Sequence, residues 1–449
     1  MKMNEQLRMG LVGLCSPIES GGQRYKELLE SASAAMRDAG IDVVVAERCV
    51  WGPADALKVC CQFKEAGIKS VAIMDITWVM DSLKYIFIQE LKLPSVFWAV
   101  PYPETFSIGC VQNFGSVLKN FGVHFEYVYG LAHDKELINK VKNVARAGEI
   151  IEKVRSMRLA LVGSRQTWRV AGPQDMSIEE WEFSKTVGPT ILHFEMEEII
   201  DAAQEICDEE AKMTLEKLSD RTGVVKCSED NMVWMAKMYM ATKAMIQNAG
   251  LAAIAAECYP NYGGMMNQAA SWLADEGIIV DTEGDIAHAV VQYILNLASE
   301  GGACALGEIG AFNDTEDYLT VCHEGSSAAS LADSMDKVVS NPAGNKASFI
   351  GFPLKAMNKV TFCDMQGSAG SYQMMIATGS TLPVSCQEWV EAGEKLVVKL
   401  RTDGVKASQV VDQMIENGLH HHVIIKEGDY TELLKMVCGY MGIQKVILK

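Results

Sequence analysis

The chain has 449 residues, and 49% of them are hydrophobic, which is enough to fill more than one core. Its 40 Lys and Arg residues stand against 58 Asp and Glu residues, giving a net charge of -18 at pH 7 that repels phosphate backbones and anionic lipid. No apolar run reaches the roughly 18 residues that a membrane span needs. We therefore expect a large globular protein of two or three domains, with neither a nucleic acid nor a membrane as its partner.

The 13 cysteines are scattered and include no Cys-x-x-Cys pair. Several of them, such as Cys15, Cys60 and Cys304, lie inside apolar runs. This pattern is typical of small buried hydrophobic side chains in a reducing compartment. The apolar stretch 9–15 is too short for a secretory signal and lacks a small-residue cleavage site, so it is predicted as the first strand. A cytoplasmic protein is expected.

The first third of the chain alternates short apolar runs with longer amphipathic segments. This alternation predicts a parallel, doubly wound α/β sheet. The predicted strands are 9–15, 42–46, 70–74, 94–99 and 125–129, and the predicted helices are 25–39, 54–66, 109–122 and 134–158. We place the first boundary near residue 155, which gives an N-terminal α/β domain at 1–155.

The rest of the chain predicts two further domains, a second doubly wound α/β domain at 156–302 and a β-rich domain at 303–449. After Gly301 the pattern changes to strands broken by turn residues, which predicts an antiparallel or barrel-like α+β domain. The predicted strands are 159–162, 252–256, 277–280, 347–351, 359–363, 373–378, 395–400 and 445–448, and the predicted helices are 196–209, 231–248, 286–297 and 430–441. The expected fold class is therefore α/β, with two Rossmann-like domains followed by a β-rich domain.

Four acidic and imidazole side chains stand at predicted strand ends or turns in the last part of the chain: Glu283, Glu308, His323 and His421. Two carboxylates and two imidazoles suit Mn²⁺, Co²⁺ or Mg²⁺ better than a structural Zn²⁺, which favours thiolates. The set predicts a catalytic rather than a structural metal site.

Each of these residues also has a structural interpretation. Glu283 follows a strand, where open α/β sheets place functional side chains, but Glu283 and Asp285 could equally charge the first turn of helix 286–297. Glu308 comes 25 residues later (308 minus 283) beside two glycines, and it could be a solvated loop carboxylate. His323 ends a short apolar run, where a histidine often serves only as a hydrogen-bonded structural residue.

Three of the eight histidines are consecutive, His420 to His422. Neighbouring side chains alternate faces in a strand, so at most one or two of the three could reach a single ion. His288, on the helix after Glu283, is a conceivable substitute ligand, although a place on the helix face explains it as well.

The order and spacing of these residues resemble the L-fucose isomerase and L-arabinose isomerase superfamily. The segment Thr282-Glu283-Gly284-Asp285 is similar to the family's Glu-Gly-Asp or Glu-Asn-Asp step, and the second acidic ligand falls on Glu308. His323 resembles the histidine of the arabinose type. The segment 418–423 resembles a Gly-x-His-His-Thr motif whose second histidine is the ligand, here His421, with His420 as the alternative.

The resemblance implies a metal-dependent aldose-ketose isomerase in which Glu283, Glu308, His323 and His421 hold Mn²⁺, with Co²⁺ or Mg²⁺ as substitutes. It also implies that Glu283 and Glu308 act as the acid and base of a cis-enediol route. The expected substrate is a pentose, a 6-deoxyhexose or a 6-substituted hexose such as a sulfosugar. The implied assembly is a homo-oligomer, a trimer or hexamer, with active sites at subunit interfaces. The alternatives are a metal-dependent sugar hydrolase or aldolase, and a sugar-binding protein without catalysis.

Overall fold

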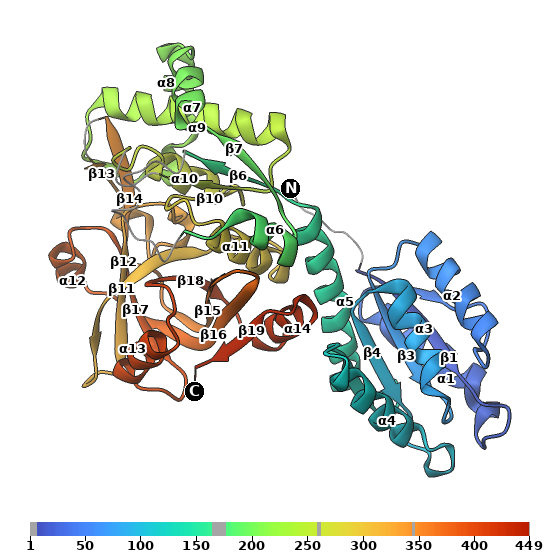
Figure 1. Cartoon of the computed structure of the whole chain (residues 1–449). Coiled ribbons are helices and arrows are strands. Elements are labelled where there is room, and N and C mark those ends of the chain that lie inside the picture. Colours follow the sequence, from blue (N-terminus) through green and yellow to red (C-terminus); the bar gives the residue numbers. More distant parts are fainter. Residues whose placement is uncertain (1–6, 164–176, 258–261, 344–345, 449) are drawn as a thin grey trace. The chain divides into compact units, whose positions relative to one another are not determined.

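The computed structural model describes residues 7–163, 177–257, 262–343 and 346–448. The chain forms two compact units, one made of residues 2–153 with 432–442 and the other of 154–431 with 443–449. The fold class predicted from the sequence is confirmed, because two parallel sheets with alternating helices precede a β-rich mixed sheet (Figure 1). The predicted boundaries of three domains stay a prediction.

The N-terminal unit is built on a five-stranded parallel sheet with the order β2-β1-β3-β4-β5. Its strands and helices are β1 (Leu7–Leu14), α1 (Tyr25–Asp38), β2 (Ile41–Val45), α2 (Pro53–Glu65), β3 (Ser70–Asp75), α3 (Asp81–Leu91), β4 (Ser95–Ala99), α4 (Ser107–Asn120), β5 (Glu126–Tyr129) and α5 (Lys135–Ser156). Strands β3 and β4 are buried along their whole length, as expected for a sheet covered on both faces.

A helix from the far end of the sequence completes this unit. Helix α14 (Thr431–Met441) packs here, and the Tyr440 hydroxyl donates a hydrogen bond of 2.7 Å to the Ser95 carbonyl at the start of β4. The Tyr440 ring also meets the His124 ring edge-on, with 4.6 Å between centroids. The last helix predicted from the sequence therefore exists, but it contributes to the first unit.

The second unit begins with a four-stranded parallel sheet with the order β10-β9-β6-β7. Its elements are β6 (Arg158–Val162), α6 (Glu180–Thr186), β7 (Thr190–Phe194), α7 (Met196–Gln204), α8 (Asp208–Lys217), α9 (Glu229–Ala249), β9 (Ala253–Ala256), α10 (Asn267–Ala274), β10 (Ile279–Asp281) and α11 (Ile286–Ala298). The short β8 (Val224–Val225) joins β13 (Val339–Ala343) and β14 (Ala347–Gly351) in a separate three-stranded sheet.

The remaining strands form a closed ring in the order β15-β18-β11-β12-β17-β16, because β16 also pairs with β15. The elements are β11 (Ala305–Asn313), β12 (Tyr318–His323), β15 (Met357–Ser368), β16 (Ser371–Leu382), α12 (Cys386–Glu391), β17 (Leu396–Thr402), α13 (Ala407–Glu416), β18 (His422–Glu427) and β19 (Gln444–Ile447). Strand β19 pairs in parallel with residues 373–376 of β16, beyond the residues 379–382 that pair with β17. The predicted barrel-like character of this region is confirmed.

A single hydrophobic core joins the central sheet to the closed ring. It contains buried residues of the central strands, such as Ile254, together with ring residues such as Phe362 and Val398. Helix α11 contacts β9 and β10 on one side and β15 and β18 on the other. Because α11 follows directly on the loop that carries Glu283, this packing fixes that loop against the ring.

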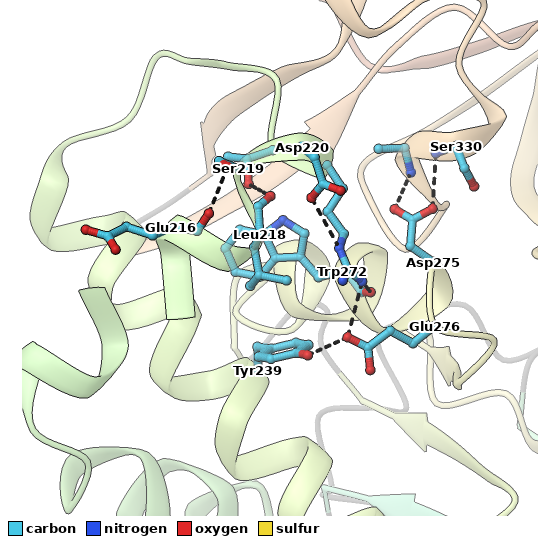
Figure 2. A network of polar contacts seen from close by, with 12 residues as sticks. Glu216, Leu218, Ser219, Asp220, Tyr239, Trp272, Asp275, Glu276 and Ser330 are labelled. Atoms are coloured by element: carbon cyan, nitrogen blue, oxygen red, sulfur yellow. Dashed lines mark hydrogen bonds and ion pairs between the residues drawn. The ribbon is translucent and has the colours of Figure 1, made fainter. Parts of the chain in front are cut away.

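A polar network anchors α10 in the same unit (Figure 2). Tyr239 of α9 donates a hydrogen bond to the Glu276 carboxylate, which also pairs with Arg221 at 3.2 Å. The Asp275 carboxylate accepts from the backbone amides of Ala329 and Ser330, each at 3.1 Å. These contacts hold the C-terminal end of α10, whose first residue, Asn267, lies at the site described below.

Some elements were absent from the sequence analysis, among them α3 and β7. The apolar residues of α3, Tyr85 to Ile88, are consecutive, so no helical period stands out. Strand β7 has only five residues and none of them is fully buried. No helix in the described ranges is both long and apolar enough to cross a membrane.

Candidate metal centre

All four residues singled out in the sequence line one cavity of about 690 Å³ in the second unit. Glu283 and His323 form one pair, with 3.2 Å between Oε1 and Nε2. Glu308 and His421 form another, with 3.7 Å between Oε2 and Nε2. His422 and Glu324 line the same cavity, so three carboxylates and three imidazoles open onto one space.

Glu283 is held in place by the loop between β10 and α11. The Asp281 carboxylate accepts the backbone amides of Glu283 and Asp285, at 3.0 and 3.1 Å, which folds the loop into a tight turn. Asp285 is the N-cap of α11 and accepts from the amides of Ala287 and His288. The helix-terminus interpretation therefore fits Asp285, whereas Glu283 faces the cavity.

Glu308 lies inside strand β11 rather than in a turn. It stands directly opposite His422 on β18 and Cys322 on β12, so the three side chains share one face of the ring. The strand continues past the neighbouring glycines with a shift of register between Ile309 and Ala311. The side chain of Glu308 is 52% exposed, against 16% for Glu283, so Glu308 is the more solvent-exposed carboxylate of the two.

His323 is oriented by its own backbone neighbourhood. Its Nδ1 atom lies 3.2 Å from the carbonyl oxygen of Gly325. A carbonyl oxygen only accepts, so Nδ1 carries the hydrogen and Nε2 points to Glu283. This arrangement, with one ring nitrogen fixed by a carbonyl and the other facing a carboxylate, is common for histidines that ligate metals.

His422 is the residue that the sequence analysis did not select. It belongs to two candidate metal-binding groups, one with Glu283 and His323 and the other with Glu308 and His421. Its buried Nδ1 atom has no hydrogen-bond partner among the described residues. Burial first, and then the neighbouring histidines, hold the pKa of His422 well below its usual value, so that the ring is neutral and able to bind a metal. No local sequence signal marks it, because its position depends on how β18 pairs with β11.

His420 and His288 lie apart from the cavity in a buried cluster with Asp285 and Asp364. His288 Nε2 lies 2.9 Å from Asp364 Oδ1, and the Asp364 carboxylate accepts the His420 amide at 3.0 Å. Burial alone would lower the pKa of His288, but the carboxylates of Asp285 and Asp364 raise this pKa to about 10, so the imidazole is cationic. A cationic imidazole has no free lone pair for a metal, which disfavours His288 as a substitute ligand.

The chemistry of the donors fits a divalent cation. Three groups of described side chains could bind a metal ion, and two of them, which share His422, open onto the cavity. Carboxylate and imidazole donors suit Mn²⁺, Co²⁺ or Mg²⁺. Lys395 and Asn267 also line the cavity, and Lys395 pairs with Glu324 at 2.6 Å.

Comparison with known proteins gives distant relatives with one shared name. A sulfoquinovose isomerase of Priestia aryabhattai is 21% identical over 379 residues, which cover 82% of each chain. A protein of the same name from Clostridium sp. (strain MSTE9) is 24% identical, and the match covers 71% of each chain. Another from Alkalicoccus urumqiensis is 20% identical, and the match covers 78% of this chain and 79% of that protein. The chain is thus distantly homologous to sulfoquinovose isomerases.

No protein-family model matches the chain. Among solved structures, a solute-binding protein of an ABC transporter from Burkholderia multivorans covers 66% of this chain and 94% of that chain at 12% identity. Its TM-score is 0.19, which is too low to support an argument about fold or function.

Proposed function

We propose that this protein is a metal-dependent aldose-ketose isomerase similar to the L-fucose and L-arabinose isomerases. The observation that supports this most is the convergence of Glu283, Glu308, His323, His421 and His422 on one cavity. Its volume of about 690 Å³ suits a ligand of the size of a hexose. The distant sulfoquinovose isomerase relatives point to the same class of reaction.

Glu283, Glu308, His323 and His422 would hold the metal, with His421 beside Glu308 at the cavity rim. This assignment differs from the sequence-based set in preferring His422 to His421, because His422 is buried and adjoins both carboxylate-histidine pairs. When bound, a divalent cation would polarise the sugar carbonyl and stabilise negative charge on its oxygen. Mn²⁺ is the expected ion.

Glu283 and Glu308 are the proposed acid and base. Interconversion of an aldose and a ketose removes a proton from one carbon and returns it to the neighbouring carbon, while a second proton moves between the two oxygens. Two carboxylates facing one cavity can divide these transfers, and general acid-base catalysis of this kind contributes about 10² to 10⁴ in rate. Asp281 holds the Glu283 loop, and His323 lies within 3.2 Å of the Glu283 carboxylate.

The name of these relatives supports a sugar carrying a sulfonate as one candidate substrate. Lys395 is the one lysine or arginine among the described residues that line the cavity, and its ammonium group could pair with such an anion. Pentoses and 6-deoxyhexoses remain the neutral candidates. A homo-oligomer, trimer or hexamer, with sites at subunit interfaces stays a prediction, and analytical ultracentrifugation would test it.

The function is tested with metal-stripped protein and a panel of pentoses, 6-deoxyhexoses and 6-sulfohexoses, with and without Mn²⁺, by following ketose formation by NMR in D₂O. Conversion of one sugar only with Mn²⁺ is expected, with deuterium entering at the carbon that receives the proton. Glu283→Gln and Glu308→Gln should each lower kcat by about 10² or more. The matched control is Glu391→Gln on α12, outside the cavity.

Several outcomes would count against the proposal. Near wild-type turnover in both glutamine variants would remove the acid-base assignment. Cleavage of a sugar instead of ketose formation would favour the hydrolase or aldolase alternative. Tight sugar binding without conversion, with or without Mn²⁺, would favour a sugar-binding protein.

A further inference from the structure

Two cysteines meet at the carboxyl edge of the N-terminal sheet. The chain leaving β1 and the loop after β2 lie side by side there, since Leu14 and Val50 form a parallel bridge. The Cys15 amide donates to the Val50 carbonyl at 3.1 Å, and the Val50 amide donates to the Gly13 carbonyl at 3.1 Å. These bonds bring Cys15 next to Cys49, the residue that precedes Val50.

The two thiols are not equivalent. Cys15 is buried, with 4% of its surface exposed, whereas Cys49 is partly exposed. The hydrogen bond between the two thiols, together with burial, raises the pKa of Cys15. The same hydrogen bond lowers the pKa of Cys49. Cys49 is therefore the thiol of the pair that a dissolved oxidant can reach first, and exposure is one of the properties of a reactive cysteine.

We propose that Cys15 and Cys49 are a reversible dithiol-disulfide pair that closes on exposure to a hydroperoxide. The Cys49 thiolate attacks one peroxide oxygen, the O–O bond breaks, and the other oxygen leaves as hydroxide, which becomes water on taking up a proton. The Cys15 sulfur then attacks the Cys49 sulfenic sulfur and displaces its oxygen, which leaves as a second water with the Cys15 proton. In sum, two thiols and one hydrogen peroxide give one disulfide and two waters. A dithiol reductant reverses the change by thiol-disulfide exchange.

The location gives the pair a structural effect. The disulfide would join the segment after β1 to the segment after β2, and would close a loop of 34 residues (49 minus 15). Both segments stand at the carboxyl edge of the sheet, so oxidation would tie together two connections that hydrogen bonds now hold. The proposal concerns the N-terminal unit alone and does not depend on the proposed isomerase activity.

The test maps cysteines in the intact, folded protein after graded hydrogen peroxide. The reaction is stopped with acid, remaining thiols are alkylated during unfolding, and the chain is cut with trypsin without reduction. Trypsin separates the two cysteines into peptides 9–24 and 49–58, each with a single cysteine. We expect these peptides to appear linked, lighter than their sum by two hydrogen atoms, and to separate after a dithiol reductant.

Among the cysteines that the structure describes, Cys61, Cys207 and Cys386 are exposed and report whether the oxidant acted. Cys49→Ser should abolish the linked peptide, while the matched control Cys61→Ser should leave it. Cys15→Ser should let Cys49 proceed to sulfinic acid, because no second thiol intercepts the sulfenic acid. Recovery of both Cys15 and Cys49 as alkylated thiols at peroxide doses that oxidise Cys61 would overturn the proposal. Linkage of either cysteine to another partner instead would overturn it as well.

Discussion

The Nε2 atom of His323 lies 3.2 Å from Oε1 of Glu283. These residues are 40 positions apart (323 minus 283), on the loop before α11 and at the end of β12. The Glu283 carboxylate raises the pKa of His323, although burial alone would lower it. The two side chains are therefore already directed at each other. Little rearrangement would be needed for both to face one cation.

The assignment of His422 as a ligand predicts a difference between two adjacent histidines. His422→Asn should weaken Mn²⁺ binding by about 10-fold or more, because a buried ligand is lost. His421→Asn should have a smaller effect, since His421 is 38% exposed at the rim. Isothermal titration calorimetry with Mn²⁺ measures both, and circular dichroism checks the fold. His193→Asn, on the exposed side of β7, is the control. A larger loss in the His421 variant would restore the sequence-based choice.

Lys395 should distinguish an anionic substrate from a neutral one. Its side chain is 38% exposed, lines the cavity and pairs with Glu324 through the ammonium group. Lys395→Met should raise KM for a 6-sulfohexose about tenfold, which corresponds to the loss of one charged hydrogen bond. KM for a neutral hexose should change little. Steady-state kinetics on both sugars provide the comparison, and an equal change in KM for both would mean that Lys395 shapes the cavity rather than reading charge.

The buried pair of Lys84 and Asp75 should set the pH dependence of stability in the N-terminal unit. Lys84 Nζ lies 3.4 Å from Asp75 Oδ2 and donates to the Cys110 carbonyl at 2.8 Å, and both charged side chains are fully buried. Lys84→Met leaves Asp75 without its cation and should cost about 3–5 kcal/mol near neutral pH. Lys58→Met, on the surface of α2, is the control.

The sign of the pH effect follows from Asp75. Burial raises the pKa of Asp75 to about 6, with Lys84 opposing, from 3.8 in the unfolded chain. The folded chain therefore binds the proton of the Asp75 carboxyl group more tightly than the unfolded chain does. The contribution of this protonation to the free energy of unfolding is complete below pH 3.8 and is lost as the pH rises through about 6. Without Lys84 the carboxyl should stay protonated to higher pH. Urea unfolding should show a smaller defect for the Lys84 variant at pH 5 than at pH 8, and an equal defect at both would contradict this account.

Closure of the C-terminal ring should be sensitive to one glycine. Gly379 of β16 pairs with Val360 of β15 and Thr402 of β17, and an added Cβ would lie 2.1 Å from the Arg401 carbonyl oxygen. Gly379→Ala should lower the free energy of unfolding by about 1–3 kcal/mol because the strands must move apart. In Gly310→Ala the nearest atom would lie 3.8 Å away, so this variant serves as the control. Thermal unfolding followed by circular dichroism would compare them, and equal midpoints would contradict the prediction.

The elements that the sequence predicted best are those with a clear period or an uninterrupted apolar run. Strand β4 was predicted at 94–99 and spans Ser95–Ala99, and α11 was predicted at 286–297 and spans Ile286–Ala298. Glu308 was expected in a turn because of its flanking glycines, yet it lies within β11, where pairing with β12 and β18 on both sides outweighs the local preference for a turn. Helix α3 was missed because its apolar residues are consecutive.

The sequence by itself determined the α/β class, the change to a β-rich region after Gly301, and the kinds of donor atoms that the site offers. These properties follow from apolar periodicity and side-chain chemistry, which are local. Only the tertiary structure decided that His422 adjoins Glu283 and Glu308 while His420 turns into the buried cluster with His288 and Asp364. That choice depends on the register of β18 against β11, which joins residues more than 100 positions apart (422 minus 308 is 114). Strand register is set by packing over the whole ring, so no window of neighbouring residues contains it.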